Sequence, residues 1–367
     1  MTRSASESRA VRQDLAFAPK VERRTGSGFR VRLRGTVIAL QRRSTVLGAF
    51  AFTIMLFVGA SLYSPSGFGS RYNLQSVAIF AAFTGFAALG QTIIVIAGGL
   101  DLSIPWTMAL GGIGVVLLAG KMPFVPAVIL VLLIGLGIGT INGALVTVLG
   151  APPLIVTLAV GAIIEGAIIA VDTTVEVGAG AVPATDIHLA NATIGRVPVF
   201  FLLWFVVAAF VGVMLTRTPL GRKIYAVGAN PRAARLAGIR VKRVQLITYS
   251  IGGVASTFAG ILLAGYVQTT YIEMGQNYLF ASVAAVALGG TALLGGTGSY
   301  WGTFAGAVTL AGLSAFLPML GLNGASVDIA YGIVIIVGMY LSRGLQKLAT
   351  MPLPSTDLGE RERDNDE

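Results

Sequence analysis

Long apolar stretches separated by short polar segments make up most of this chain. Ten of these stretches have the length that an α-helix needs to cross a bilayer, which is about 17 to 25 residues. They cover residues 45–63, 74–97, 104–120, 125–148, 151–171, 197–215, 245–267, 278–294, 301–317 and 325–341. This pattern predicts an all-α polytopic membrane protein with about ten transmembrane helices.

Glycine interrupts several of the apolar stretches and accounts for 48 of the 367 residues, roughly double its usual share. In membrane proteins this favours close helix packing and broken helices. After the second stretch the chain reads AGGLDLSIP from Ala97 to Pro105. We expect a helix break there, including Gly98 and Gly99, with Ser103 as the N-cap of the third helix. Asp101 at this break either caps the backbone or lines a pathway.

The fourth stretch carries glycine at every fourth position, at Gly135, Gly139 and Gly143. Such spacing puts the three glycines on one face and predicts tight contact with a neighbouring helix. Asn142 stands beside them, and we expect its amide to form a hydrogen bond across helices.

Composition narrows the possible functions. The chain is 55% hydrophobic and 11% charged, whereas soluble domains carry about 25% charged residues. It has no cysteine and one histidine, His188. Disulfides, thiolate catalysis, cysteine-ligated metals and a histidine metal cluster are therefore excluded, and we expect no metal site. The chain also lacks a phosphate-binding glycine loop, a His-Glu-x-x-His motif and a nucleophile elbow, so we do not expect an enzyme.

The net charge is 26 − 16 = +10, and its distribution predicts the topology. Basic residues concentrate in 1–43, 217–243 and 343–367. With the N-terminus inside, ten crossings place all three stretches in the cytoplasm, as the positive-inside rule requires. The loop 172–196 then lies outside, in keeping with its acidic residues. The charge thus marks cytoplasmic segments and does not indicate nucleic-acid binding.

Three regions follow from this topology. Residues 1–43 are expected to form a disordered, basic cytoplasmic tail, within which 37–43 can form a short helix on the inner leaflet. Residues 44–343 form the transmembrane domain, and 344–367 form a cytoplasmic C-terminal tail.

The cytoplasmic loop 217–243 is the longest polar interruption of the apolar pattern. Asn230 as N-cap and Pro231 at the first helical position predict a short helix, and Gly238 is expected to end it. Small residues at Ala233, Ala234 and Ala237 would allow a partner protein to approach this helix closely. The alternative is a charged loop that only sets the topology.

Few ionisable residues fall inside the apolar stretches, and this bears on the mode of transport. Ion-coupled carriers place acids, histidines or basic residues inside the helix bundle. Here Asp101 and Glu165 lie inside, while Asp172 and Asp328 lie near the ends of stretches. Glu165 and Asp172 share a helix face and either line an outward cavity or mark a partly solvated helix end. A secondary transporter or channel stays open, but a passive permease driven by a separate ATPase fits better.

Four motifs in order give this chain a family resemblance. They are AGGLDLS at 97–103, Asn142-Gly143 with PLIVTL at 153–158, GRKIYAVGAN with AARLAGI at 221–239, and ALGGT with LGGTG at 287–298. Together they resemble the membrane subunits of bacterial monosaccharide ABC importers, of the ribose, xylose, arabinose and galactoside type. The resemblance covers about residues 45–343.

The resemblance implies ten helices in a bacterial cytoplasmic membrane, two copies of the chain forming the pathway, an ATPase docked below and a periplasmic sugar-binding protein above. ATP is used by the ATPase, and no cofactor is bound by this chain. The loop at 228–239 is implied to be the coupling helix. The implied coupling residues are Gly228, Asn230, Pro231, Ala233, Ala234, Arg235 and Gly238. The implied pathway or signature residues are Gly98, Gly99, Asp101, Ser103, Asn142, Pro153, Thr157, Glu165, Gly289 and Gly290.

Three positions depart from the family pattern. Pro105 stands where the family has glycine, Leu154 replaces a phenylalanine, and Glu165 stands near a usual basic position. The acidic residue at Glu165 affects which solute the pathway is expected to accept. The related branched-chain amino-acid permeases stay an alternative.

Overall fold

The structure is a computed structural model that describes residues 26–175 and 180–350, with side chains described for 45–172 and 180–337. The chain divides into two units, Met1–Leu40 and Gln41–Glu367. Helix α2 (Gly26–Tyr63) begins inside the segment for which the sequence predicts a disordered tail. Residues 26–43 are therefore helical, and no proline interrupts the sequence between Gly26 and Tyr63. The rest of the expected N-terminal tail and residues 351–367 lie outside the described residues.

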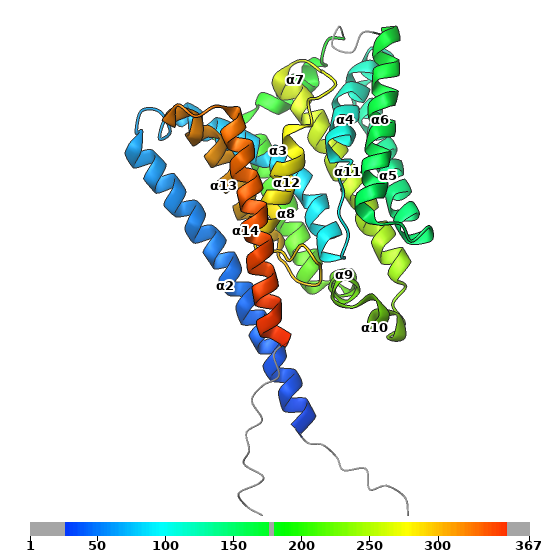
Figure 1. Ribbon diagram of the computed structural model, residues 1–367. Coiled ribbons are helices and arrows are strands. Elements are labelled where there is room, and N and C mark those ends of the chain that lie inside the picture. Colours follow the sequence, from blue (N-terminus) through cyan, green and yellow to red (C-terminus); the bar gives the residue numbers. More distant parts are fainter. Residues whose placement is uncertain (1–25, 176–179, 351–367) are drawn as a thin grey trace, which may run out of the picture. The chain divides into compact units, whose positions relative to one another are not determined.

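The second unit is built almost entirely from helices (Figure 1). After α2 come α3 (Arg71–Ile96), α4 (Ile104–Ala119), α5 (Phe124–Val148), α6 (Pro153–Val175), α7 (Ala184–Asn191), α8 (Val199–Arg217), α9 (Pro219–Ala229), α10 (Pro231–Leu236), α11 (Val241–Val267), α12 (Asn277–Leu288), α13 (Tyr300–Phe316) and α14 (Gly324–Thr350). A short 3₁₀ helix, Leu317–Leu320, follows α13, and the strands β1 (Thr193–Ile194) and β2 (Val197–Pro198) form a small antiparallel pair.

Each of the ten apolar stretches contains a helix. Among the described residues, seven helices are long and apolar enough to cross a membrane. The other three are shorter apolar helices, Ile104–Ala119, Asn277–Leu288 and Gly324–Val337. The prediction of an all-α polytopic membrane protein is therefore confirmed.

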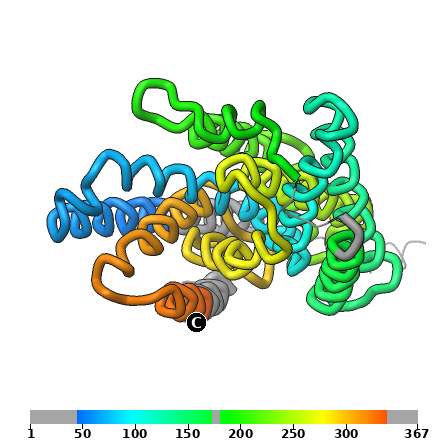
Figure 2. Tube along the Cα trace, turned by 90° about the horizontal axis from the view of Figure 1, so that it is seen from above, coloured from blue at the N-terminus to red at the C-terminus, as the bar shows by residue number. Residues whose placement is uncertain are grey.

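Helix α3 is the central element of the bundle. Every residue from Ala81 to Ile96 is buried, and α3 packs against α8, α11, α12 and α13. Figures 1 and 2 show α12, α13 and α14 gathered beside it, and α4, α5 and α6 gathered beyond α11. Close contact is possible because α3 carries glycine where large groups approach: an added Cβ at Gly85 would overlap the Trp204 ring. Helix α3 thus contacts α12 and α13 directly, and it also contacts α11, which packs against α4 and α5.

The glycine face predicted on α5 packs against α11. An added Cβ would overlap Thr257 Oγ1 at Gly135 and the Tyr249 carbonyl oxygen at Gly139, and would lie 2.9 Å from Leu246 Cα at Gly143. Because α11 would meet every one of these added carbons, the backbones touch directly. The prediction of a tight helix contact on this face is confirmed.

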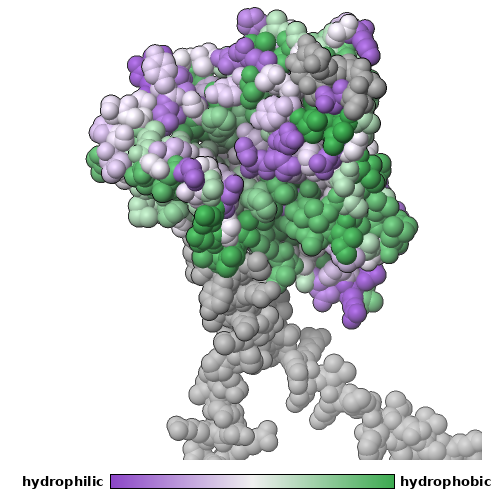
Figure 3. Space-filling view, turned by 45° about the horizontal axis from the view of Figure 1, so that its top comes forward, coloured by the Kyte–Doolittle hydropathy of each residue, from purple (hydrophilic) through white to green (hydrophobic). Residues whose placement is uncertain are grey.

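Large apolar side chains cover much of the outer surface of the second unit. Leu62 on α2, Val125 on α5, Ile163 on α6 and Phe210 on α8 are all exposed. Figure 3 shows hydrophobic residues gathered in a band, with hydrophilic residues above it and a separate hydrophilic group below. Such an apolar band is the surface that a lipid bilayer covers.

Candidate functional site

A buried polar network occupies the break between α3 and α4. Asp101 Oδ1 accepts hydrogen bonds from the Ser103 backbone N–H at 2.8 Å and from the Ser103 hydroxyl at 2.6 Å. Asn142 on α5 donates from Nδ2 to Ser103 Oγ at 2.9 Å, so the predicted hydrogen bond across helices is confirmed. Asp101 is 2% exposed, and its carboxylate caps the backbone of the break.

Ser103 occupies the N-cap position of α4, as predicted, but its side chain does not cap the helix. Its backbone has φ −82° and ψ −5°, whereas an N-cap residue is typically extended, and its side chain makes no capping hydrogen bond. The reason is that its hydroxyl is already bonded to Asp101 and Asn142. Pro105 lies in the first turn of α4, as predicted.

Further hydrogen bonds connect the break to its neighbouring helices. The Leu102 N–H donates to Thr157 Oγ1 on α6 at 3.0 Å, and the Tyr249 hydroxyl on α11 donates to the Leu100 carbonyl at 3.1 Å. The Asp101 N–H donates to Gln91 Oε1 on α3 at 3.3 Å. Residues from α3, α5, α6 and α11 therefore meet at the break. Gln91 and Tyr249 were missed by sequence reasoning because neither belongs to a motif that indicates a site.

This network is incomplete within the described part of the chain. Gln91 Nε2 and Asn142 Oδ1 are buried there without a hydrogen-bond partner. A buried polar atom left unpaired costs about 1–3 kcal/mol. The break is therefore held less firmly than a fully paired network of the same size.

A three-way glycine junction lies at the same end of α3, and we define it by Ile96, Gly98, Gly228, Gly295 and Gly296. The Gly296 N–H donates to the Ile96 carbonyl oxygen at 2.9 Å. An added Cβ at Gly228 would overlap that same oxygen, and one at Gly295 would lie 2.9 Å from Gly98 Cα. The end of α3, the end of α9 and the α12–α13 loop thus contact each other through backbone atoms.

Helix α9 is attached to this junction by a second contact as well. The Tyr225 hydroxyl donates to the Gly298 carbonyl oxygen at 2.8 Å, which connects α9 to the α12–α13 loop. Gly98, Gly295 and Gly296 have φ values of 85°, 90° and 81°. This left-handed conformation favours glycine, so the positions suit glycine for their backbone shape as well as for close approach.

The short helix α10 has the boundaries that its sequence predicts. Asn230 Oδ1 accepts from the N–H groups of Arg232 and Ala233, both at 3.0 Å, and Pro231 occupies the first helical position. Gly238 follows with φ 78°. The predictions of Asn230 as N-cap and of Gly238 as the stop are confirmed.

The face that α10 presents differs from the expected one. Ala234 is 4% exposed and packs inside the chain, so it is not available for a partner to approach. Leu236 is 92% exposed and was missed by the sequence analysis. The sequence does show Leu236 as a large apolar residue inside a basic loop, and this feature could have identified it. The basic side chains around it are all exposed, and they are Arg222, Lys223, Arg232, Arg235, Arg240, Lys242 and Arg243.

Comparison with known proteins identifies the family. Residues 73–339 match the family described as the branched-chain amino acid transport system / permease component. The chain belongs to this family. The permease is 32% identical over 304 residues to a ribose import permease protein of Bacillus subtilis (strain 168), covering 81% of this chain and 92% of that protein.

Two further relatives cover similar regions. An autoinducer 2 import system permease protein of Klebsiella pneumoniae is 32% identical over 317 residues, which are 84% of this chain and 94% of that protein. A fructose import permease protein of Bifidobacterium longum is 32% identical over 254 residues, which are 68% of this chain and 71% of that protein. No solved structure matches the chain.

Family membership settles the general role of the chain. The permease is a transport component and not an enzyme, and it is a multi-pass protein of the cytoplasmic membrane. Permeases of ABC import systems act together with an ATPase and a substrate-binding protein.

Of the remaining predicted residues, Pro153 begins α6, and its carbonyl oxygen accepts a hydrogen bond from the Thr157 hydroxyl at 2.9 Å. Within the described part of the chain, Glu165, Gly289 and Gly290 form no hydrogen bond with the polar network of this permease. Glu165 is half-buried on α6, eight residues beyond Thr157, or about 12 Å along the helix. An added Cβ at Gly289 would overlap the backbone of Gly302 on α13, and one at Gly290 would lie 2.8 Å from Thr45 Cβ on α2. The roles of these residues in transport stay predictions.

A second buried carboxyl lies at the other end of the permease, on α7 (Figure 1). Asp186 is 1% exposed, and its Oδ2 atom has no hydrogen-bond partner among the described residues. It packs against Gly265 of α11, where an added Cβ would lie 2.7 Å from Asp186 Oδ1. Burial raises the pKa of Asp186 to about 7.

Proposed function

We propose that this chain is the permease subunit of an ATP-driven ABC importer for a monosaccharide. The observation that carries the proposal is its similarity, over most of its length, to import permeases named for ribose and for fructose. Two copies of the chain form the pathway, and a periplasmic binding protein delivers the sugar. The chain itself binds no cofactor, since ATP is bound and hydrolysed by the partner ATPase.

The proposed topology has ten membrane helices with both termini in the cytoplasm. Seven long apolar helices and three shorter ones supply the ten crossings. The positive-inside rule supports this arrangement, because α9, α10 and the basic tails then share the cytoplasmic side. Loop 172–196 and α7 then face the periplasm.

The α9–α10 loop is proposed to couple ATP hydrolysis to transport. Its exposed Ala233, Leu236 and Ala237 would sit in a cleft of the ATPase, surrounded by exposed basic side chains. When the cleft closes on ATP, α10 and α9 would move together, since only Asn230 separates the two helices. The alternative is that this charged loop only sets the topology of the chain and does not couple to the ATPase.

The glycine junction provides the path from that loop into the membrane. Gly228 at the end of α9 lies against the Ile96 carbonyl, so displacement of α9 pushes directly on the last turn of α3. Helix α3 is buried along its inner two thirds and contacts α11, α12 and α13. A rigid, central helix would carry this displacement to the helices on both of its sides.

The test is transport by the reconstituted complex. The permease, its ATPase and its binding protein are placed in proteoliposomes, and uptake of radiolabelled ribose, fructose and leucine is measured. We expect sugar uptake that needs ATP and survives collapse of the proton gradient. Accumulation driven by a proton gradient in vesicles containing the permease alone would contradict the proposal, and uptake of leucine alone would favour the amino-acid alternative.

A further inference from the structure

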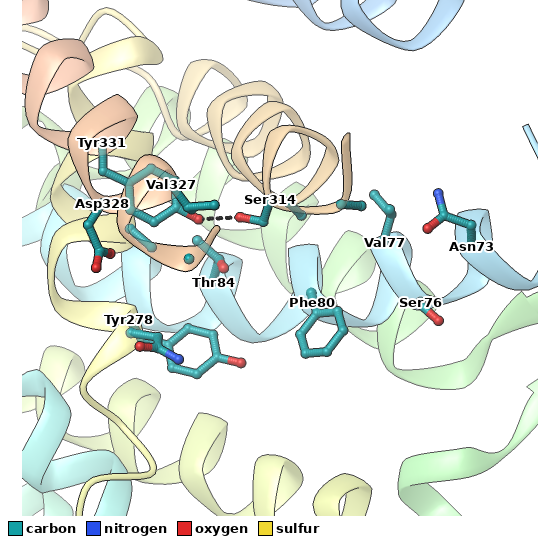
Figure 4. A pocket seen from close by; sticks show the side chains of 15 residues that line it. Asn73, Ser76, Val77, Phe80, Thr84, Tyr278, Ser314, Val327, Asp328 and Tyr331 are labelled. Carbon is teal, nitrogen blue, oxygen red and sulfur yellow. Dashed lines mark hydrogen bonds between the residues drawn. The ribbon is translucent and has the colours of Figure 1, made fainter. Parts of the chain in front are cut away.

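A pocket of about 530 Å³ opens among α3, α12, α13 and α14 (Figure 4). This volume falls within the range of about 300–1,000 Å³ that small-molecule sites occupy. The polar and aromatic groups of its lining come from Asn73, Ser76, Phe80, Thr84, Asn277, Tyr278, Ser314, Asp328 and Tyr331.

The pocket lies at the end of the bundle away from the glycine junction. Asn73 is in the first turn of α3, and Asn277 is the first residue of α12. The lining residues of α3 end at Thr84, twelve residues or about 18 Å of helix before Ile96. In the proposed topology this is the periplasmic half of the membrane, where a solute released by a binding protein would arrive.

Two of the lining polar groups are available to a ligand. Asp328 and Asn277 are exposed, and neither forms a hydrogen bond or ion pair within the described part of the chain. The Ser314 hydroxyl donates to the Leu310 carbonyl oxygen at 2.9 Å and therefore accepts from the Tyr331 hydroxyl at 2.6 Å, which leaves acceptor capacity on both oxygens. The pocket therefore offers a carboxylate, an amide and hydroxyl groups around one space.

Aromatic rings supply the other side of the pocket. Figure 4 shows Phe80 and Tyr278 together, across the pocket from Asp328, Ser314 and Tyr331. Phe80 is about half exposed, so part of its ring is free for contact. An apolar surface facing a few hydrogen-bonding groups suits a ring that has a C–H face and an edge of hydroxyls.

The charges of the lining exclude some solutes. Asp328 is the one charged side chain among the described lining residues, and none of them is basic. A carboxylate or phosphate on the solute would find no counter-charge, and it would be repelled by Asp328. A neutral polyol meets no such penalty. Hydroxyls of the polyol can donate to Asp328, and its other hydroxyls can pair with the hydroxyl and amide groups of the pocket.

We propose that this pocket is the site at which the permease receives its solute, and that it binds a neutral monosaccharide. The assignment rests on the proposed function and adds the residues of the membrane subunit that take part. Asp328 and Asn277 bind hydroxyls of the sugar, while Tyr278 and Phe80 contact its C–H face. The lining residues named above all belong to one copy of the chain.

Protection from thiol labelling tests binding without relying on transport. The chain has no cysteine, so Ala315→Cys places a single thiol in the pocket without removing any polar group. Glu273→Cys, on an exposed loop outside the lining, is the matched control. The purified variants are treated with 2-aminoethyl methanethiosulfonate in the presence of ribose, fructose, xylose, glucose, galactose or leucine. We expect the imported sugar to slow labelling at 315 and to leave labelling at 273 unchanged.

Substitution in the pocket then tests its part in import. Asp328→Asn keeps the size of the side chain and removes a charged acceptor, which lowers affinity for a hydroxyl about tenfold. We expect sugar import by the complete complex to fall by about that factor, and the Glu273→Gln control to import at the wild-type rate. Thermal stability of Asp328→Asn should be unchanged because the residue is exposed.

The outcomes separate this proposal from the proposed function. If the complex imports a sugar with ATP, yet that sugar neither protects position 315 nor depends on Asp328, the pocket assignment is wrong and the function stands. If leucine protects position 315 and sugars do not, the assigned ligand class is wrong. If the wild-type complex imports none of the sugars, the proposed function fails and the pocket assignment fails with it.

Discussion

At the scale of single residues, Asp186 shows how burial gives a side chain a property that its sequence does not indicate. It stands in a polar loop with other acids, which indicates an exposed residue. The structure buries it between α7 and α11 with one oxygen unpaired. The protonated carboxyl is favoured there, because an ionised one would lose its hydration without gaining a partner.

This environment predicts a pH-dependent stability. The pKa of Asp186 is about 7 in the folded protein, against 3.8 for the free side chain. Between these values the folded state binds more protons than the unfolded state, so stability falls as pH rises from about 4 to 7. The slope contributed by this group approaches about 1.4 kcal/mol per pH unit.

The measurement is thermal unfolding of the detergent-purified permease from pH 5 to 8, compared with Asp186→Asn. We expect the variant to be less pH-sensitive and to be relatively more stable at pH 8. Glu273→Gln, which changes an exposed carboxyl, should retain the wild-type dependence. Identical slopes for Asp186→Asn and wild type would contradict the assignment.

At the scale of elements, α10 shows that a helix can be predicted correctly while its faces are not. Its cap and its stop depend on neighbouring residues, which the sequence displays. Which side turns inward depends on α9 and α11, against which α10 packs. Ala234 consequently faces the protein, and Leu236 faces the solvent.

Leu236 is therefore predicted to anchor the ATPase. Leu236→Asp should weaken association with the ATPase at least tenfold, since it removes an exposed apolar contact and introduces a charge. The permease itself should keep its stability within about 0.5 kcal/mol because the side chain is 92% exposed. Co-purification of the ATPase with tagged permease is the measurement. The control is Leu189→Asp on α7, also an exposed leucine, and equal ATPase recovery from both variants would rule out the anchor.

The glycine junction yields a second prediction at this scale. In Gly228→Ala the added carbon overlaps the Ile96 carbonyl and lies 2.6 Å from the Gly296 nitrogen, so α9 must move away from α3. Such overpacking costs about 1–3 kcal/mol. We expect the ATPase still to bind while sugar import falls at least tenfold.

A matched glycine serves as the control for this variant. Gly137 on α5 has no atom within 4 Å of an added Cβ, so Gly137→Ala should import normally. ATPase co-purification and ATP-dependent uptake are measured together. Normal import by Gly228→Ala would mean that the junction does not transmit movement.

At the scale of the whole molecule, the proposed topology puts the basic loop on the side of the ATPase and the pocket on the side of the binding protein. The proposed ten crossings would place α9 and α10 on the cytoplasmic side and α7 on the periplasmic side. The cysteine-free chain allows a direct test with impermeant thiol reagents. Thr185 and Ala233 are both exposed, whereas the adjacent Asp186 and Ala234 are buried and unsuited to labelling.

We expect Thr185→Cys to react in intact spheroplasts, and Ala233→Cys to react only after permeabilisation. The reagent cannot cross the bilayer, so the two sites must differ if an odd number of crossings separates them. Loop 172–196 lies between α6 and α8. Only α8 separates this loop from α9, so one crossing lies between Thr185 and Ala233. Labelling of both cysteines from the same side would contradict the ten-helix topology.

The sequence alone determined the features that depend on neighbouring residues. Apolar stretches of sufficient length predict helices because a bilayer offers no partner for unpaired backbone groups. The glycine spacing of α5 predicts its contact face, and Asn230, Pro231 and Gly238 predict the limits of α10. Each of these follows from helix geometry, which repeats over a few residues.

Only the tertiary structure decided what depends on residues far apart in the chain. The Ser103 hydroxyl accepts a hydrogen bond from Asn142, which is 39 residues away in sequence, and its side chain makes no capping hydrogen bond to its own helix. Ile96, Gly228 and Gly296 meet because the ends of α3 and α9 converge with the α12–α13 loop, and the pocket combines residues from Asn73 to Tyr331. Packing selects these partners among many that the sequence allows equally, because any apolar helix face can in principle cover any other.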